Sequence, residues 1–377
     1  MKVEPLQFPC SSCGAYVHFD IESGKMECPF CKTHSQIKTH TISKHRYDTQ
    51  IHSGINNTKK ELSCAKCGAG FEVAPYVLAS LCPYCKTSFV TQAQNSIKID
   101  GLIPFKITHK QAQKLFKKWV GSLWFAPSAF TKYLDGDNKL DGVYVPHWSF
   151  DTDTTTHYTG QRGDAYYVSV RRTIRDANGR YKEVQVQERR IRWSPASGVV
   201  YNSFSDVTTP SSRYIDTAIV SDLQNWDHSA LCGFSSEYLA GFEAQEHSID
   251  LNNGFENAKR VIAPYIEQKI RYDIGGDEQR IHSIDTRYAN THYLNNLYPI
   301  WKATFTWKNK QYEYAINAQT GEVSGERPYS IVKIVFAILG VLVLLGALYY
   351  ADQTYNTQTD DMWFNEHPNS HMELQEW

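Results

Sequence analysis

Four pairs of cysteines, each pair separated by two residues, dominate the first quarter of the chain. They fall into two sets with the same spacing: Cys10, Cys13, Cys28 and Cys31, followed by Cys64, Cys67, Cys82 and Cys85. The second set is the first displaced by 54 positions, and Cys28-Pro-Phe-Cys-Lys-Thr is repeated as Cys82-Pro-Tyr-Cys-Lys-Thr. Such duplicated spacing is typical of zinc ribbons, in which two thiolate knuckles complete a tetrahedron around one ion. We therefore predict two structural Zn²⁺ ions, each held by four cysteines.

Size and compartment favour metal over a redox pair or a disulfide framework. Each ribbon is too small to fold on apolar burial alone, so metal binding would supply the folding energy. The segment before Cys10 lacks the apolar stretch of a secretory signal, which predicts a reducing compartment. Gly14 and Gly68 each follow the second cysteine of a set and can adopt a positive φ there. Four thiolates leave no open coordination position, so the sites are expected to be structural.

Charge argues against nucleic acid as the main ligand of the ribbons. Residues 1–95 carry ten Lys or Arg and seven Asp or Glu, a net charge of +3. Two Zn²⁺ ions with eight thiolates add −4, which leaves this segment near −1, and the whole chain also carries −1. A surface that follows phosphates is usually strongly positive. We therefore expect the ribbons to contact protein, with nucleic-acid binding as the alternative.

An uncharged apolar run near the C-terminus predicts a single transmembrane helix. Ile334–Tyr350 has no charged residue, and the flanking residues extend the run to 331–351, about the twenty residues that a bilayer requires. Arg327 and Lys333 precede the run, whereas the tail 352–377 has six acids and neither Lys nor Arg. The positive-inside rule places the N-terminal part in the cytoplasm and the tail outside the inner membrane. The alternative is a buried helix of a soluble protein.

Between the ribbons and this helix, the sequence predicts an α+β domain with an antiparallel sheet. Thr108 and Gln111 form a capping box, and the apolar residues that follow recur with helical spacing. The opposite face carries Lys110, Lys114, Lys117 and Lys118, which fits either a solvated surface or contact with anionic lipid.

Strand patterns and turn residues complete the domain. Residues 143–150 form an apolar strand, and 165–174 with 181–193 alternate around Asp176-Ala-Asn-Gly179, which predicts a hairpin. A helix is expected over 255–271, with a bend at Pro264, and a strand pair over 303–308 and 311–316. The domain boundaries are: ribbon 1, residues 1–39; linker, 40–60; ribbon 2, 61–95; α+β domain, 100–330; transmembrane helix, 331–351; acidic tail, 352–377.

No catalytic motif stands out in the chain. There is no G-x-S-x-G, Walker A or H-E-x-x-H sequence. The run Gly275-Gly276-Asp277, beside Gln279, Arg280 and His282, is the most site-like, but it also fits a turn between elements. Cys232 is expected to be a small buried side chain rather than a nucleophile. We expect no enzymatic activity, no catalytic residues and no small-molecule cofactor.

Several further motifs carry a resemblance to a known family. They are Tyr144-Val-Pro-His-Trp-Ser-Phe-Asp151, Tyr158-Thr-Gly-Gln-Arg-Gly-Asp164, Tyr238-Leu-Ala-Gly-Phe242, Asp273-Ile-Gly-Gly-Asp277, Asn317-Ala-Gln-Thr-Gly-Glu322 and Gly325-Glu-Arg-Pro-Tyr-Ser330. With the ribbons, they make residues 8 to 350 resemble bacterial membrane-anchored double-zinc-ribbon proteins, often labelled TFIIB-type zinc ribbon or primosomal protein N′ helicase-like. The chain has no helicase motif. The resemblance implies association with phage-shock-protein-A-like or flotillin-like (SPFH) membrane proteins, and a role as an anchor.

Together these features predict a non-enzymatic membrane scaffold that recruits or holds a partner protein at the inner membrane. A membrane-tethered nucleic-acid-binding protein, using the ribbons and the 110–118 lysines, is the alternative. An unrecognised enzyme in the middle domain is a third reading, because catalytic residues need not be contiguous.

Overall fold

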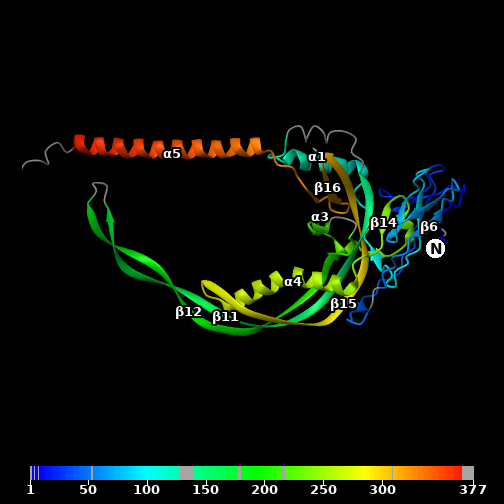
Figure 1. The fold of residues 1–377 in the computed structure, drawn as a ribbon, viewed down its shortest axis with the longest axis horizontal. Coiled ribbons are helices and arrows are strands. Elements are labelled where there is room, and N and C mark those ends of the chain that lie inside the picture. Colours follow the sequence, from blue (N-terminus) through cyan, green and yellow to red (C-terminus); the bar gives the residue numbers. More distant parts are fainter. Residues whose placement is uncertain are drawn as a thin grey trace, which may run out of the picture. The chain divides into compact units, whose positions relative to one another are not determined.

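A computed structural model describes residues 2–3, 5–6, 8–51, 54–127, 140–175, 180–213, 217–307 and 309–366 (Figure 1). The chain forms two compact units. The first consists of Met1–Phe116 with Lys139–Gly325, and the second of Lys117–Asn138 with Glu326–Trp377. The described residues combine several helices with a larger share of strands, so the fold mixes α and β structure as expected.

Short strands make up the N-terminal third of the first unit. They are β1 (Lys2–Val3), β2 (His18–Asp20), β3 (Lys25–Glu27), β4 (His34–Ser35), β5 (His45–Arg46), β6 (Lys60–Ser63), β7 (Gly70–Val73), β8 (Val77–Leu81), β9 (Ser88–Val90) and β10 (Gly101–Leu102). Strands β2, β3 and β4 form one small sheet, and β1, β6 and β7 form another. The remaining strands of this group, β5, β8, β9 and β10, join a larger sheet.

Long strands build the larger sheet. Its other members are β11 (Asp141–Arg175), β12 (Tyr181–Pro210), β13 (Cys232–Gly233), β14 (Glu243–Gln245), β15 (Glu278–Trp307), β16 (Lys310–Asn317) and β17 (Val323–Gly325). The central order is β13-β10-β15-β11-β14-β8-β9, with β12 beside β11 and β16 beside β15. Most pairs are antiparallel, whereas β10–β15 and β11–β14 are parallel. The sheet is therefore mainly, but not wholly, of the predicted antiparallel kind.

The predicted hairpin exists and is much longer than its sequence pattern indicates. Strand β11 has 35 residues and β12 has 30, and they pair from His147↔Pro210 to Arg175↔Tyr181. The predicted strands 143–150 and 165–174 are therefore parts of one strand, which bulges where the register shifts near residues 151 and 160. Bulges let a long strand bend without ending. The expected turn, residues 176–179, lies outside the described residues.

Helix α4 (Leu251–Ile274) covers one face of the long strands, and it contains the predicted helix 255–271. Asp250 caps it by accepting a hydrogen bond from the Asn253 backbone N–H at 2.9 Å, and Gly275 ends it with φ 65°. Its buried residues recur every three or four positions: Leu251, Phe255, Ala258, Ile262, Ile266, Ile270 and Ile274. This spacing places one apolar stripe against the sheet.

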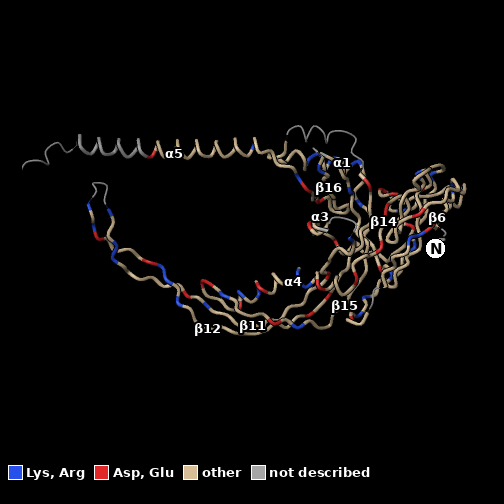
Figure 2. Tube along the Cα trace, in the orientation of Figure 1, with Lys and Arg blue, Asp and Glu red and all other residues tan. Residues whose placement is uncertain are grey.

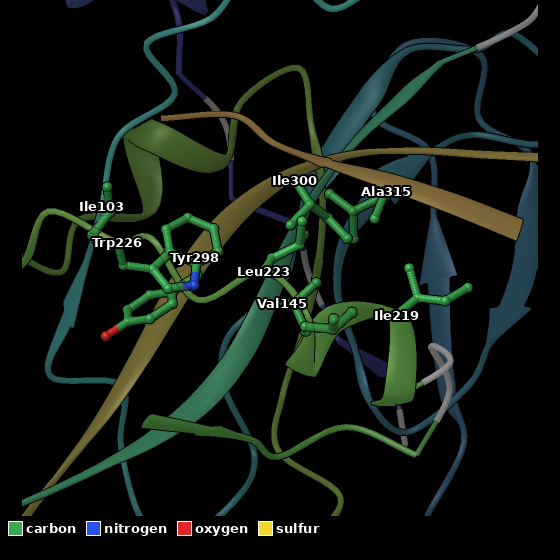
Figure 3. Packing of buried hydrophobic residues seen from close by; sticks show 10 residues of the cluster. Ile103, Val145, Ile219, Leu223, Trp226, Tyr298, Ile300 and Ala315 are labelled. Carbon is green, nitrogen blue, oxygen red and sulfur yellow. The ribbon is translucent and has the colours of Figure 1, made fainter. Parts of the chain in front are cut away.

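The opposite face of the strands packs on the short helix α3 (Thr217–Ser221) and the loop that follows it (Figure 3). Val145 and Tyr298 are paired across β11 and β15, and both contribute to this buried cluster. The 144–148 and 298–301 motifs, which resemble each other in sequence, therefore lie side by side on neighbouring strands. Leu223 and Trp226 cover them from the loop. The short 3₁₀ helices His228–Ala230 and Ser236–Leu239 follow.

Helix α1 (His109–Ser122) matches its prediction closely. Gln111 Oε1 accepts a hydrogen bond from the Thr108 backbone N–H at 2.8 Å, which is half of the expected capping box. Phe116, on the apolar face of α1, stacks on Tyr314 of β16 at 3.7 Å between ring centroids. The four lysines of the opposite face are exposed.

Parts of residues 40–60, the predicted linker, contact the large sheet and helix α4. Strand β5 pairs with β15 through Arg46↔His292. The Tyr47 ring lies 4.6 Å from that of Phe255, and its hydroxyl donates to Asn252. Most other residues of this polar segment are exposed.

The second unit contains helix α5 (Ile331–Glu366). Near its start, Lys333 Nζ donates to the backbone oxygen of Ala126 at 2.8 Å. The helix continues well past residue 351, so the first part of the expected acidic tail is helical. The sequence offers no Gly or Pro to end a helix between Ala351 and Pro368. Residues 367–377 lie outside the described residues.

Candidate metal centres and membrane helix

The first cysteine set converges on one point. Cys10 and Cys13 precede β2, and Cys28 and Cys31 lie between β3 and β4. The Cys10 and Cys31 Sγ atoms are 3.5 Å apart, as are those of Cys13 and Cys28. All four lie within 4.8 Å of one another. Four sulfurs bound to zinc at about 2.3 Å would be about 3.8 Å apart, so the set is nearly in coordination geometry already.

The second set repeats this arrangement. The Cys64 and Cys85 Sγ atoms are 3.6 Å apart, and those of Cys67 and Cys82 are 3.9 Å apart. Again all four lie within 4.8 Å of one another. In each set the first and third cysteines are buried, whereas the second is exposed. The structure thus brings the eight predicted ligands together as two separate tetrads, each of which could hold a metal ion.

The backbone folds identically at the four knuckles. The N–H of Gly14 donates to the Cys10 carbonyl at 2.9 Å, and that of Lys32 donates to the Cys28 carbonyl at 3.0 Å. The second tetrad repeats both bonds at Gly68 and Lys86. Gly14 and Gly68 have φ near 70°, as the sequence predicts. Lys32 and Lys86 have φ of 59° and 60°. The sequence does not predict these positive angles, because lysine rarely adopts them.

A threonine supports the last cysteine of each tetrad. Thr33 Oγ1 lies 3.2 Å from Cys31 Sγ, and Thr87 Oγ1 lies 3.3 Å from Cys85 Sγ. Hydrogen bonds from the side chain and backbone of the threonine stabilise the thiolate, and they lower the pKa of Cys31 and of Cys85 to about 6. Because thiolates rather than thiols bind metal, this favours ligation by Cys31 and Cys85 at neutral pH. The repeated Cys-Lys-Thr sequence carries this feature. Hydrogen bonds with the neighbouring cysteines, together with burial, raise the pKa of Cys13 to about 12 and that of Cys67 to about 11, so these two thiols would lose their protons as metal binds.

Four thiolates with these spacings fit a closed tetrahedral zinc site better than a catalytic one, which would keep a position for water. Soft sulfur ligands also suit zinc more than calcium or magnesium. Zinc as the bound metal remains the prediction made from the sequence.

Both ribbons contact the rest of the first unit, the first through the 3₁₀ helix Ser236–Leu239 and the residue after it, and the second through the large sheet. In the first ribbon, the Phe19 N–H donates to the Ala240 carbonyl at 3.0 Å, and its ring lies 5.1 Å from that of Tyr238. In the second, β8 pairs with β14 through Ala79↔Ala244. Both ribbons therefore share a folded unit with the long strands.

A buried ion pair adds a contact that the sequence did not reveal. The Lys60 side chain is fully buried, and its Nζ donates to Glu246 Oε1 and to the Val77 carbonyl, both at 2.8 Å. Glu246 Oε2 accepts two backbone hydrogen bonds at 2.9 Å, from Gln94 and Asn95. The pair therefore joins β6 of the second ribbon to the segment after β14.

The apolar part of α5 could span a membrane. Ile331–Asp352 forms 22 residues of continuous helix, about 33 Å long, and none of its most apolar stretch is buried. A core helix of a soluble protein would instead be mostly buried by its own chain. Its orientation remains a prediction from the flanking charges.

The other candidate residues have structural partners. Gly275 and Gly276 have positive φ and end α4, and Asp277 accepts a hydrogen bond from the Ala165 N–H at 2.7 Å. Arg280 lies 3.9 Å above the Trp193 ring. Cys232 is half-buried in β13, where burial raises the pKa of its thiol. The glycines and Asp277 therefore form a turn after α4, and Cys232 is a small, partly buried side chain.

The chain is similar to a protein described as "Uncharacterized protein YdjG" from Bacillus subtilis (strain 168). The two are 24% identical over 351 residues, which cover 89% of this chain and 94% of the relative. The similarity therefore covers most of both chains. No protein-family model matches the chain, and no solved structure matches it significantly.

Proposed function

We propose that this protein is a non-enzymatic, membrane-anchored zinc-ribbon scaffold that holds a partner protein at the inner membrane. Two closed cysteine tetrads and a helix able to span a bilayer support this proposal. The ribbons would face the cytoplasm, where thiols remain reduced. The partner would be a protein of the phage-shock-protein-A-like or SPFH class, as the family resemblance implies.

The observation that carries the proposal is an exposed aromatic side chain at the same position of both ribbons. Phe30 is 79% exposed and Tyr84 is 67% exposed. Each lies between the last two cysteines of its tetrad, in the repeated Cys-Pro-aromatic-Cys sequence. A metal-bound knuckle would hold such a ring rigidly, so little conformational entropy is lost when it binds.

Aromatic side chains of this kind commonly dominate the energy of protein interfaces. Neither ring belongs to the buried core of the described residues. The ribbons also share one folded unit with the long strands, so two aromatic contacts at a fixed separation are available to one partner. A rigid pair of weak contacts provides the selective binding that a scaffold requires.

The proposal is tested by purifying the full chain in mild detergent and identifying co-purifying proteins by quantitative mass spectrometry. The wild-type protein should retain one partner in stoichiometric amount. The double variant Phe30→Ala, Tyr84→Ala should retain at least tenfold less, because each truncated hot spot typically costs about 1–2 kcal/mol. Zinc content and membrane insertion should be unchanged.

A matched control removes an equally exposed aromatic elsewhere. Tyr272 lies on α4 and is 83% exposed. Tyr272→Ala should leave the recovered partner unchanged. Equal losses in both variants, or no protein enriched over a detergent blank, would show that the ribbons do not recruit a partner.

A further inference from the structure

Beyond the start of β15, strands β11 and β12 continue alone as a two-stranded arm. The last β11–β15 pair is Gly163↔Glu278. The β11–β12 ladder then runs from Asp164↔Arg192 to Arg175↔Tyr181 without another strand beside it. Figure 1 shows this part of the green ribbon extending past the yellow start of β15. We call residues 164–175 and 180–192 the distal arm.

One face of the distal arm carries most of its aliphatic side chains, interspersed with charged ones such as Arg172, Lys182 and Arg190. Alternate residues of a strand point to one face, and paired residues share it. The pair Val170↔Val186 marks this face. Its other apolar members are Tyr166, Val168, Ile174 and Val184. All six are half-buried or exposed, and Ile174 is 47% exposed.

The opposite face has no valine and is richer in polar side chains, although Ile191 and the exposed Tyr167 and Tyr181 also lie on it. It carries Ser169↔Gln187 and Thr173↔Glu183 as cross-strand pairs. A two-stranded ribbon that exposes aliphatic side chains is marginal in water without something to cover them. The exposed aliphatic side chains on the valine face, mixed with basic ones, therefore indicate a surface that binds through that face.

The distal arm is also strongly basic. It contains eight basic residues: Arg171, Arg172, Arg175, Arg180, Lys182, Arg189, Arg190 and Arg192. Its acids are Asp164, Glu183 and Glu188, so the net charge is +5, whereas the whole chain carries −1. Figure 2 shows these basic residues in blue along the distal part of β11 and β12. Two of the arginines form ion pairs with the same carboxylate, that of Glu188: Arg172 at 3.8 Å and Arg190 at 3.4 Å.

We propose that the distal arm binds the anionic surface of a lipid bilayer. The valine face would enter the boundary between headgroups and acyl chains, and the arginines would contact lipid phosphates. Basic and apolar side chains on one element are what such an interface requires. This inference rests on the membrane anchoring in the proposed function, because anchoring holds the protein at a bilayer.

Lipid fits the arm better than nucleic acid does. A nucleic acid would satisfy the arginines, but valine and isoleucine gain little against phosphates and sugars. Sequence readout by a β-ribbon uses polar side chains at base edges. A tethered protein also needs only a weak second contact, since anchoring raises the local concentration of the arm at the surface.

The test places a fluorescent probe on each face of the arm in the full chain. An environment-sensitive fluorescent amino acid replaces Val170 on the valine face, or Ser169 on the opposite face as the matched control. Each protein is reconstituted in nanodiscs of phosphatidylcholine alone, or with one-third phosphatidylglycerol. In anionic discs the Val170 probe should shift to the blue and become at least threefold less accessible to an aqueous quencher. The Ser169 probe should not change.

Two charge variants identify the contact. Arg171→Gln, Arg172→Gln, Arg189→Gln and Arg190→Gln together should abolish the protection, because each basic residue near an anionic surface favours binding about fivefold. Removing four charges from α1 with Lys110→Gln, Lys114→Gln, Lys117→Gln and Lys118→Gln should preserve it.

Three results would overturn the inference: equal quenching in both kinds of disc, loss of protection in the α1 variant alone, or protection that requires added duplex DNA. None of these would affect partner capture through Phe30 and Tyr84, so the two proposals fail separately.

Discussion

At the scale of single residues, the tetrads are specified by local rules. The sequence predicts both the convergence of the cysteines and the positive φ of the glycines after two knuckles, and the structure shows both. Other residues acquire their character only from distant neighbours. His147, which lies in an apolar strand, is the clearest case: it is buried, its ring stacks on that of Tyr298 at 4.6 Å, and its Nδ1 is hydrogen-bonded to the Val145 carbonyl.

His147 should make the folded state sensitive to acid. Burial, helped by neighbouring His228 and opposed by the Val145 hydrogen bond, lowers the pKa of its imidazole to about 4. The unfolded chain binds this proton near pH 6.5, so stability is complete above that pH and falls as pH drops toward 4. The loss should approach about 3 kcal/mol.

Unfolding of the full chain in mild detergent, followed by tryptophan fluorescence at several pH values, measures this loss. Acid also releases metal, so the informative quantity is the difference between wild type and His147→Gln. The variant should be less sensitive to pH between 6.5 and 4. If the stability of the two proteins falls equally between pH 6.5 and 4, groups other than His147 cause the acid sensitivity.

At the scale of elements, the ion pair between Lys60 and Glu246 holds the second ribbon on the sheet. Lys60→Met would leave the Glu246 carboxylate buried beside two backbone donors without its cation. Breaking a buried pair in this way costs about 3–5 kcal/mol. We expect Lys60→Met to be destabilised by that amount in denaturant unfolding.

The double variant Lys60→Met, Glu246→Gln provides the control. Its amide oxygen can still accept from the Gln94 and Asn95 N–H groups, and no charge remains buried. It should therefore recover much of the lost stability. A single variant within about 0.5 kcal/mol of wild type would mean that the pair is exposed to solvent in solution.

The elements also show which parts of the fold a sequence can predict. Helix α1, the hairpin and the strand pair across Asn309 follow from periodicity and turn residues, which act over a few positions. The 35-residue length of β11 could not be predicted, because its pattern changes where β15 stops covering it. Lys60 and Tyr47 were missed for a similar reason: their partners lie about 190 to 210 residues away.

At the scale of the whole molecule, the chain joins an N-terminal region with two cysteine tetrads, each able to hold a metal ion, to a helix that could cross a bilayer. Charge around the apolar stretch 334–350 of α5 is asymmetric, with Arg327 and Lys333 before it and, from Asp352 onward, six acids and neither Lys nor Arg. The positive-inside rule then predicts a cytoplasmic N-terminus. This orientation would also keep both tetrads in the compartment where their thiols stay reduced.

Reporter fusions measure the orientation. A reporter active only outside the cytoplasm should work after Trp377 and fail before Met1. Replacing Arg327 and Lys333 with Gln should reduce the fraction of molecules in this orientation, because it removes the cytoplasmic basic flank. The reverse pattern of reporter activity would place the tetrads in an oxidising compartment and contradict the assigned topology.

The central claim is that eight thiolates hold two structural zinc ions on a membrane-anchored chain. Native mass spectrometry of the full protein, purified anaerobically in mild detergent, tests it most directly. The account predicts a mass equal to the chain plus two zinc ions, and one zinc ion in each of Cys10→Ser and Cys64→Ser, because the tetrads share no ligand. Fewer than two ions in the wild-type protein, or loss of both from a single variant, would contradict it.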